Sequence, residues 1–432
     1  MDFIKKIIQT DLFKVTSLNS LSVLLKIGTG LITSKLLAVF VGPSGMALVG
    51  NFRNFSSSLE GISTLGFSSG IIKYVGENED NKKELEKIIS TVLISFLVVA
   101  FFLSILIFVF SDNLCHKILG NNLQYAIVFK VVAVILPWNV ISILFVSIIN
   151  GLGKYNKVIF ANIITNLIGV LSSLVLIYYF KTLGAFFSII IVPVLLVFVT
   201  SFYLPSKIQI FRRLNFREYD FKILKNLGTF SLMILPPTVL SPIFNLQIRN
   251  FLIANVGLNQ SGFWEAITRI SNLYMLFIGT MISVYFYPKL IRANGTIKTN
   301  QVIWSFYRFI LPVFIAGTIV IYFFRFFIIK LLFTNEFLPV SELFLWQLAA
   351  DVFKVLGMIL GVLLMVRKKT LHFIFIEVMA ILFLYFVSLF CIEYFGLEGV
   401  VIAQAVENFL YLLVLGIYFR KDLFQNRNNT AL

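Results

Sequence analysis

Twelve long apolar stretches follow one another along this chain, and they constrain its fold more than any other feature. A helix needs about 20 mostly apolar residues to cross a bilayer. Apolar residues make up 59% of the chain and charged residues only 13%, which excludes an ordinary soluble protein. We therefore predict an all-α polytopic membrane protein with twelve transmembrane helices. They lie near residues 14–40, 46–75, 88–110, 123–149, 158–180, 185–203, 226–253, 262–287, 302–327, 342–366, 371–393 and 399–419.

The basic residues between these stretches predict how the chain is oriented. An even number of spans places both termini on one side of the membrane. Lys and Arg number 22 in the termini and the even-numbered loops, whereas the odd-numbered loops hold three, Lys117, Lys181 and Lys330. Because positive loops stay in the cytoplasm, both termini are predicted to be cytoplasmic. These loops account for most of the net charge of +16, and no basic stripe on a soluble fold indicates a nucleic-acid partner.

The longest predicted cytoplasmic connection, residues 204–225, divides the chain almost in half. Its basic and aromatic residues are typical of an amphipathic segment on an anionic membrane surface. A constant offset of 215 relates "YYFKTLGA" (178–185) to "EYFGLEGV" (393–400), each at the turn from the fifth to the sixth span of its half. We predict an N-terminal lobe (1–203) and a C-terminal lobe (226–432) of six helices each, with pseudo-two-fold symmetry along the membrane normal.

Charged residues inside the spans predict where a ligand binds. A charge near the bilayer centre costs about 2.5–3.5 kcal/mol, so it usually faces a protein interior or a watery cavity. Basic residues outnumber the acids that share these positions, and an excess of buried cations predicts that an anion binds. The predicted spans contain ten cations, Lys26, Lys35, Arg53, Lys73, Lys130, Arg249, Arg269, Arg308, Arg325 and Lys354, and five acids lie deep in them, Glu60, Glu265, Asp351, Glu377 and Glu407.

Some of these charges have an oppositely charged neighbour one turn away in the same helix. Glu265 and Arg269 are four residues apart, and Asp351 and Lys354 are three apart. Each pair therefore shares a helical face. The spacing fits a structural ion pair and a functional site equally well.

Two further spacings concern the first two spans. Arg53 and Glu60 are seven residues apart, nearly on one face but two turns distant. Lys26 and Lys35 are nine apart and fall on opposite faces of a straight helix. Either the helix bends near Gly28 and both lysines line one cavity, or Lys35 extends to the outer interface while Lys26 faces inward. Both alternatives are open at this stage.

Enzymatic and metal-binding motifs find little support in the sequence. No G-x-x-x-x-G-K-[ST] loop occurs, and neither His116 nor His372 has the spacing of a metal ligand. Cys115 and Cys391 imply no disulfide framework. We expect a protein that is not an enzyme and that has no resident cofactor.

The stretch "KIGTGLITSKLLAVFVGPSGMALVGNFRNF" (26–55) resembles the first two helices of the lipid III and O-antigen flippases, members of the multidrug/oligosaccharidyl-lipid/polysaccharide exporter superfamily. "LFLWQLAADVFKVLGMILGVLLM" (343–365) is similar to their tenth helix, and "SVYFYPKL" fits the end of the eighth. The resemblance implies a MATE-like fold whose two lobes open alternately to either side. It also implies transport of undecaprenyl-pyrophosphate-linked oligosaccharide across the bacterial inner membrane, with membrane lipids and the polysaccharide polymerase machinery as partners.

The same resemblance gives the charged residues roles. Pyrophosphate suits basic residues, because Arg offers a forked donor and Lys a point charge. In related exporters, acidic cavity residues couple transport to H⁺ or Na⁺. The candidates for pyrophosphate are Lys26, Arg53, Lys35, Arg249 and Arg269, and those for ion coupling are Asp351, Glu60 and Glu265.

Three other functions remain open. A multidrug antiporter of the same fold would favour acidic and aromatic residues for cationic drugs, whereas cations are in surplus here. A peptidoglycan precursor flippase is closer in chemistry, but that family usually has fourteen helices. A non-transporting subunit of the polysaccharide assembly pathway would bind the substrate without moving it.

Overall fold

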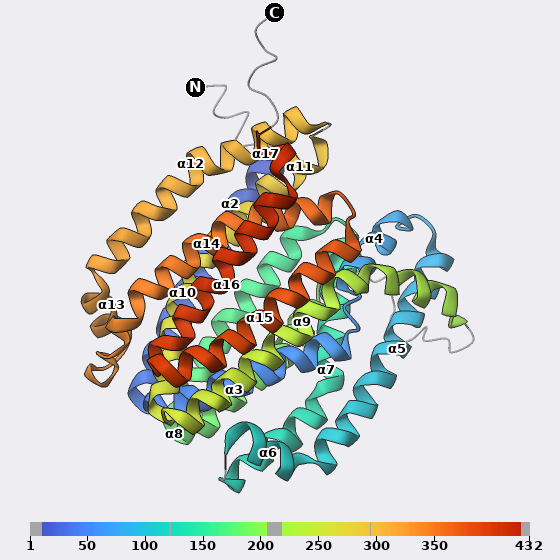
Figure 1. Ribbon diagram of the computed structural model, residues 1–432. Helices are drawn as coiled ribbons and strands as arrows, with labels where there is room; N and C mark the ends of the chain where they lie inside the picture. Colours follow the sequence, from blue (N-terminus) through green and yellow to red (C-terminus); the bar gives the residue numbers. More distant parts are fainter. Residues whose placement is uncertain (1–10, 121, 205–217, 294, 425–432) are drawn as a thin grey trace, which may run out of the picture. The chain divides into compact units, whose positions relative to one another are not determined.

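The computed structural model describes residues 11–120, 122–204, 218–293 and 295–424, and every regular element in these ranges is helical (Figure 1). Twelve long helical segments of the described chain match the predicted spans. They are α2 (Asp11–Phe40), α3 (Gly42–Ser63), α5 (Lys82–Val109), α7 (Ala126–Gly151), the two parts of α8 (Tyr155–Ser201), α9 (Phe221–Asn255), α10 (Leu258–Met281), α12 (Thr296–Phe323), α14 (Val340–Val366), α15 (Thr370–Phe395) and α16 (Leu397–Tyr418).

Length and hydropathy alone identify ten of the described helices as able to cross a membrane. That number treats α8 as one helix and leaves out α3, which carries Arg53 and Glu60 among several serines. Shorter elements join the long ones. They are α4 (Ser68–Glu77), α6 (Ser111–Leu119), η1 (Leu123–Tyr125), the π-helical η3 (Ile282–Phe286), α11 (Tyr287–Arg292), α13 (Arg325–Leu332), η4 (Asn335–Phe337) and α17 (Arg420–Phe424).

The second predicted span, residues 46–75, is not one continuous helix. A turn after α3 separates it from α4, and Gly66 in this turn has a φ of +64°, which an α-helix does not accommodate. The Thr64 hydroxyl donates to the carbonyl of Glu60 at 2.8 Å, inside the last turn of α3. The apolar run nevertheless continues into α4, where residues such as Ile71 are fully buried.

The two halves of the chain contain the same unusual turn. Lys181 has φ 49° and ψ −120°, and it interrupts the 47-residue α8 between its two parts. Gly396 has φ 57° and ψ −129°, between α15 and α16. These positions are separated by the 215-residue offset predicted from the sequence. The backbone therefore repeats where the sequence repeats.

The glycine that follows each of these turns is also equivalent. A Cβ at Gly184 would lie 1.9 Å from the Leu176 carbonyl oxygen, and a Cβ at Gly399 would lie 2.1 Å from the Cys391 carbonyl oxygen. Each glycine thus packs against the backbone eight residues earlier, so only glycine fits at either position. The match of turn, glycine and contacted carbonyl supports the predicted internal repeat.

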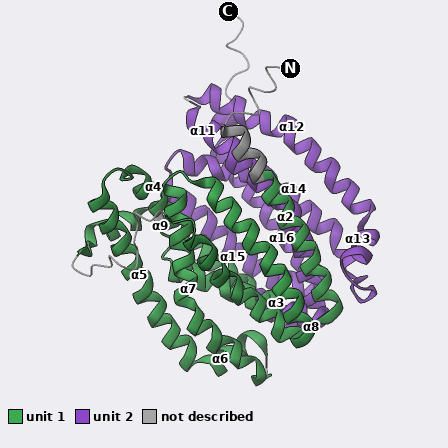
Figure 2. Cartoon of the chain, turned by 180° about the vertical axis from the view of Figure 1, so that it is seen from behind, with its two compact units in different colours: residues 1–41, 48–246 green, residues 42–47, 247–432 purple. Residues whose placement is uncertain are grey.

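The chain forms two compact units, shown in two colours in Figure 2. In unit 1, residues 1–41 and 48–246, α2 packs on α8, and α7 packs on both α5 and α8. In unit 2, residues 42–47 and 247–432, α14 packs on α10, α12 and α16, and α15 packs on α16. The lobes predicted at 1–203 and 226–432 stay predictions, and residues 205–217 of the predicted linker lie outside the described residues.

The start of α3 belongs to unit 2 because it packs closely on α10. A Cβ at Gly262 would lie 1.9 Å from the carbonyl oxygen of Pro43, which leaves no room for a side chain. Pro43 is part of the "VGPSG" turn that carries the resemblance noted above. This turn is therefore fixed by backbone contact and not only by its own conformation.

Large apolar side chains are exposed along the outward faces of the long helices. Phe101 is 65% exposed on α5, and Phe309 and Val313 are 65% and 71% exposed on α12. Contiguous apolar surface of this kind is costly in water and favourable in lipid. The protein is a multi-pass membrane protein.

Candidate functional site

A cavity in unit 1 brings together two of the predicted site residues. Its volume is about 160 Å³, and Arg53 and Glu60 of α3 both line it. Ser56 and Ser57 of α3 and Asn139 of α7 add polar groups, and apolar residues of α7 and of the second part of α8 complete the wall. We refer to this space as the α3 cavity.

The sequence of α3 explains why its polar groups converge. Arg53, Ser56, Ser57 and Glu60 follow the spacing i, i+3, i+4 and i+7, which places them on one face of a helix. Arg53 and Glu60 share a helical face, as their spacing of seven residues predicted. They are about 10 Å apart along the helix axis. A cavity of this size holds several water molecules, so both charges remain reachable by water.

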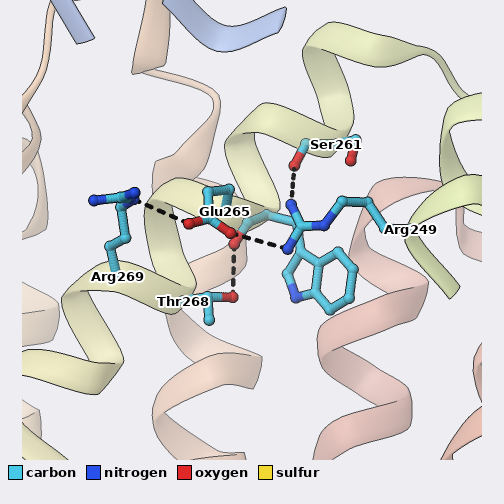
Figure 3. Close-up of polar contacts among 6 residues, drawn as sticks. Arg249, Ser261, Glu265, Thr268 and Arg269 are labelled. Atoms are coloured by element: carbon cyan, nitrogen blue, oxygen red, sulfur yellow. Dashed lines mark hydrogen bonds and ion pairs between the residues drawn. The ribbon is translucent and has the colours of Figure 1, made fainter. Parts of the chain in front are cut away.

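A second group of predicted residues forms a buried ion cluster in unit 2 (Figure 3). Arg249 of α9 donates to Glu265 Oε2 of α10 at 3.0 Å, and Arg269 Nε donates to Glu265 Oε1 at 3.0 Å. All three residues are at most 7% exposed. Arg249 also donates to the Ser261 carbonyl at 3.2 Å, and its guanidinium lies 4.4 Å from the centre of the Trp264 ring.

This geometry favours the structural interpretation of the Glu265–Arg269 pair. Both carboxylate oxygens of Glu265 accept from arginine, so the cluster ties α9 to α10. The three side chains together carry a net charge of +1, because Glu265 neutralises one of the two arginine charges. The predicted roles of Arg249 and Arg269 in holding pyrophosphate, and of Glu265 in coupling, stay predictions.

Asp351 of α14 is 3% exposed and lies among neutral donors. Ser271 Oγ donates to its Oδ2 at 2.7 Å, the Tyr274 hydroxyl donates to the same oxygen, and Gln347 Nε2 donates to Oδ1 at 3.2 Å. Lys354, the neighbour predicted from sequence, is exposed and forms no ion pair with Asp351 in the described structure. Hydrogen bonds to three donors therefore stabilise this carboxylate.

The sequence prediction missed two of these donors and one further contact. Ser271 and Tyr274 lie about 80 residues before Asp351 in sequence, so no local spacing signals them. In the same unit, the Tyr411 hydroxyl donates to Glu377 at 2.6 Å across α16 and α15. Gly357 of α14 makes room for this tyrosine, because a Cβ there would lie 2.9 Å from its ring.

The remaining two candidates lie on α2, which is helical without interruption from Asp11 to Phe40. Lys26 is exposed, whereas Lys35 is half-buried. Because α2 keeps helical geometry between them, the two lysines, nine residues apart, lie on opposite faces of the helix. Neither lysine lines the α3 cavity.

Comparison with known proteins adds to this geometry. A sequence model of the family described as "Polysaccharide biosynthesis protein" matches residues 12–294, which is more than half of the chain. The chain belongs to this family. The matched region of this family member includes the α3 cavity and the Arg249–Glu265–Arg269 cluster.

Two curated relatives agree with the family. The family member is 29% identical to the lipid III flippase of Escherichia coli strain K12 over 374 residues, covering 85% of this chain and 88% of that one. It is 22% identical to a putative O-antigen transporter of Shigella flexneri over 211 residues, covering 48% and 49% of the two chains. The predicted resemblance to the lipid III and O-antigen flippases is confirmed.

Solved structures show the same fold. A multidrug resistance MATE family transporter in its inward-facing conformation superposes with a TM-score of 0.79 at 16% identity, over 95% of this chain and 96% of that one. A MOP superfamily transporter from Pyrococcus furiosus superposes with a TM-score of 0.71, also at 16% identity, over 97% of each chain. The predicted MATE-like all-α fold is confirmed.

Proposed function

We propose that the protein moves undecaprenyl-pyrophosphate-linked oligosaccharide from the cytoplasmic to the periplasmic leaflet of the bacterial inner membrane, by alternating access coupled to H⁺ or Na⁺. The family and the named relatives, a lipid III flippase and a putative O-antigen transporter, support this substrate class. In this proposal both termini are cytoplasmic, as the distribution of basic residues predicts.

The observation that carries the proposal is the placement of Arg53 in the α3 cavity. An arginine in a helix within the membrane is costly unless it reaches water or a partner, so a cavity around it suits a ligand that arrives and leaves. The guanidinium fork matches the oxygens of a pyrophosphate. Ser56, Ser57 and Asn139 line the same space and offer hydrogen bonds to oxygen-rich groups.

Glu60 at the other end of the cavity is suited to ion coupling. A carboxylate that water reaches exchanges H⁺ or Na⁺ more readily than one held by two arginines, which is the situation of Glu265. Asp351 is the second candidate, because its hydrogen-bond partners Ser271, Tyr274 and Gln347 are all neutral.

The test is surface polysaccharide display in a flippase-deficient bacterial strain, at matched levels of membrane protein. Arg53→Ala should reach the membrane normally and lose most display, and Arg53→Lys should be impaired less, because lysine keeps the charge and loses the fork. The matched control is Arg308→Ala, which removes an exposed arginine of α12 outside the cavity. Normal display by Arg53→Ala would contradict the proposal.

A further inference from the structure

A pocket in unit 2 gathers three basic residues that the proposed function does not use. Lys289 and Arg292 of α11 and Lys298 of α12 line a space of about 350 Å³, together with Gln301 and Ser305. All three basic side chains are exposed. Lys289 Nζ donates to the Tyr285 hydroxyl at 2.5 Å, so its partner there is neutral. We refer to this space as the basic pocket.

The basic pocket lacks acidic residues that could neutralise it. No Asp or Glu occurs between Glu265 and Glu336 in the sequence. Within the described residues, none of the three basic side chains forms an ion pair. The nearby Asp422 of α17 accepts from Arg367 instead, at 2.7 Å. Three cations in one space without a carboxylate repel each other and attract an anion.

Aromatic residues place the basic pocket at the level of the membrane surface. Tyr285, Tyr287 and Trp304 lie within four residues of lining residues in the sequence and are 51%, 36% and 47% exposed. Tyr and Trp concentrate where the bilayer meets water, because their rings are apolar and their polar atoms need hydrogen bonds. The Trp304 indole N–H donates to the Leu423 carbonyl at 3.1 Å, which holds α17 against the start of α12 (Figure 1).

The ends of α11 and α12 also indicate that the basic pocket lies at the membrane surface. α11 ends at Arg292 and α12 begins at Thr296, so the pocket lies where the chain leaves the bilayer and enters it again. This connection is on the side that the basic residues predict to be cytoplasmic. A ligand there would present its charged group at headgroup level.

We propose that the basic pocket binds the phosphate of a lipid headgroup. Arg292 supplies a forked donor, the two lysines supply point charges, and Gln301 and Ser305 supply neutral hydrogen bonds to phosphate oxygens. Basic pockets of this kind between membrane helices suit anionic headgroups. An anionic phospholipid and a polyprenyl pyrophosphate both carry this chemistry, and the inference does not depend on transport.

The experiment measures lipid retention by native mass spectrometry of the full-length protein in neutral phosphatidylcholine nanodiscs with an increasing fraction of phosphatidylglycerol. The test variant is Lys289→Gln/Arg292→Gln/Lys298→Gln. We expect it to lose phosphatidylglycerol retention by roughly fivefold for each charge removed. The variant Lys289→Arg/Arg292→Lys/Lys298→Arg keeps the charge and should retain the lipid, provided that both variants elute from size exclusion like the wild type.

The control is Lys82→Gln/Lys83→Gln/Lys157→Gln, which makes the same change in net charge at exposed lysines of unit 1. Competition with undecaprenyl pyrophosphate and with inorganic phosphate separates the sources. Displacement of phosphatidylglycerol by undecaprenyl pyrophosphate identifies the polyprenyl lipid as the tighter ligand, and retention of phosphatidylglycerol in its presence identifies the phospholipid; both results support the proposal. Equal loss in the control variant, or binding of inorganic phosphate as tight as that of the lipids, would overturn it.

Discussion

Arg53 and Arg249 both lie in long helices that match predicted spans, yet their charges have opposite surroundings. Arg53 lies on a polar face of α3 that lines a cavity, with Glu60 two turns away on the same face. Arg249 is buried at 3% exposure and shares Glu265 with Arg269. One arrangement keeps its charges reachable, and the other matches them within the protein.

This contrast shows how a charge that can bind a ligand differs from a charge that stabilises helix packing in a membrane protein. Both arrangements satisfy the requirement that a charge in the bilayer needs water or a partner. A charge that is fully engaged by the protein stabilises packing between helices, whereas a charge at a cavity wall can exchange one partner for another. The comparison predicts that substitutions in the buried cluster impair folding and that substitutions in the cavity impair transport.

The largest expected effect is that of Glu265→Gln. This change removes the carboxylate to which both Arg249 and Arg269 donate, and removing one member of a buried ion group costs about 3–5 kcal/mol. We expect a sharp fall in membrane yield and in the midpoint of thermal unfolding. The counterpart Glu60→Gln changes a water-reachable acid and should leave yield near that of the wild type. Equal membrane yields of Glu265→Gln and Glu60→Gln would contradict the distinction between the buried cluster and the α3 cavity.

The next effect is that of Asp351→Asn. The amide has one acceptor oxygen in place of two and brings two donors toward the hydroxyls of Ser271 and Tyr274, so we expect a loss of about 1–3 kcal/mol in the free energy of unfolding. Enough protein should reach the membrane to measure transport as a function of pH and Na⁺. We expect that dependence to change.

The matched variant for Asp351 is Tyr274→Phe, which removes one donor and keeps the carboxylate. It should lower stability and leave the ion dependence of transport as it is in the wild type. If Asp351→Asn also leaves the ion dependence unaltered, Asp351 is structural like Glu265, and the functional charges are confined to the α3 cavity.

The sequence predicted the helices well because each one is an apolar run of the required length. It predicted the repeat mainly from the equal number of spans in each half and from three identities at an offset of 215, and the equivalent packing of Gly184 and Gly399 supports it. It also placed Arg53 and Glu60 on one face, since seven residues make nearly two turns. These successes share a cause, because periodicity and length act locally along the chain.

The sequence could not predict which charges pair across helices. Arg249 reaches Glu265 from 16 residues away, and Ser271 reaches Asp351 from 80. Such contacts depend on how helices pack, which no spacing within one helix encodes. The break between α3 and α4 was missed for another reason, because the apolar run continues through the turn, in which Leu65 and Gly66 have positive φ.

A smaller effect on stability is expected from substitutions in the two repeated turns. Gly396 has a positive φ that glycine adopts without strain, and Lys181 adopts nearly the same angles with a side chain. Gly396→Ala should therefore destabilise the protein by about 1–2 kcal/mol, whereas Lys181→Gly should stabilise it by up to about 1 kcal/mol. Thermal unfolding in detergent measures both. Changes of the same sign would mean that the two turns are not equivalent.

The smallest effect concerns a charge pair outside the apolar segments, Lys87 and Asp220 in unit 1. Their side chains are 2.7 Å apart and partly exposed, and the Asp220 carboxylate also accepts from the backbone N–H of Lys222 at the start of α9. The hydrogen bond from Lys87, followed by that from the Lys222 backbone, holds the pKa of Asp220 below its ordinary value of 3.8. A lowered carboxyl pKa stabilises the fold above the ordinary value, and this contribution is lost as the pH falls through the lowered one.

Unfolding midpoints measured from neutral to acidic pH should show this dependence in the wild type and less of it in Asp220→Asn, which cannot ionise but keeps an acceptor for the Lys222 N–H. Asp220→Ala loses the acceptor as well and should be less stable than Asp220→Asn at every pH. Because solvent screens an exposed pair, both variants should remain far more stable than Glu265→Gln. A loss as large as that of Glu265→Gln would show that exposure does not govern the cost of losing a charge partner in this protein, and the contrast between the cavity and the buried cluster would then need another cause.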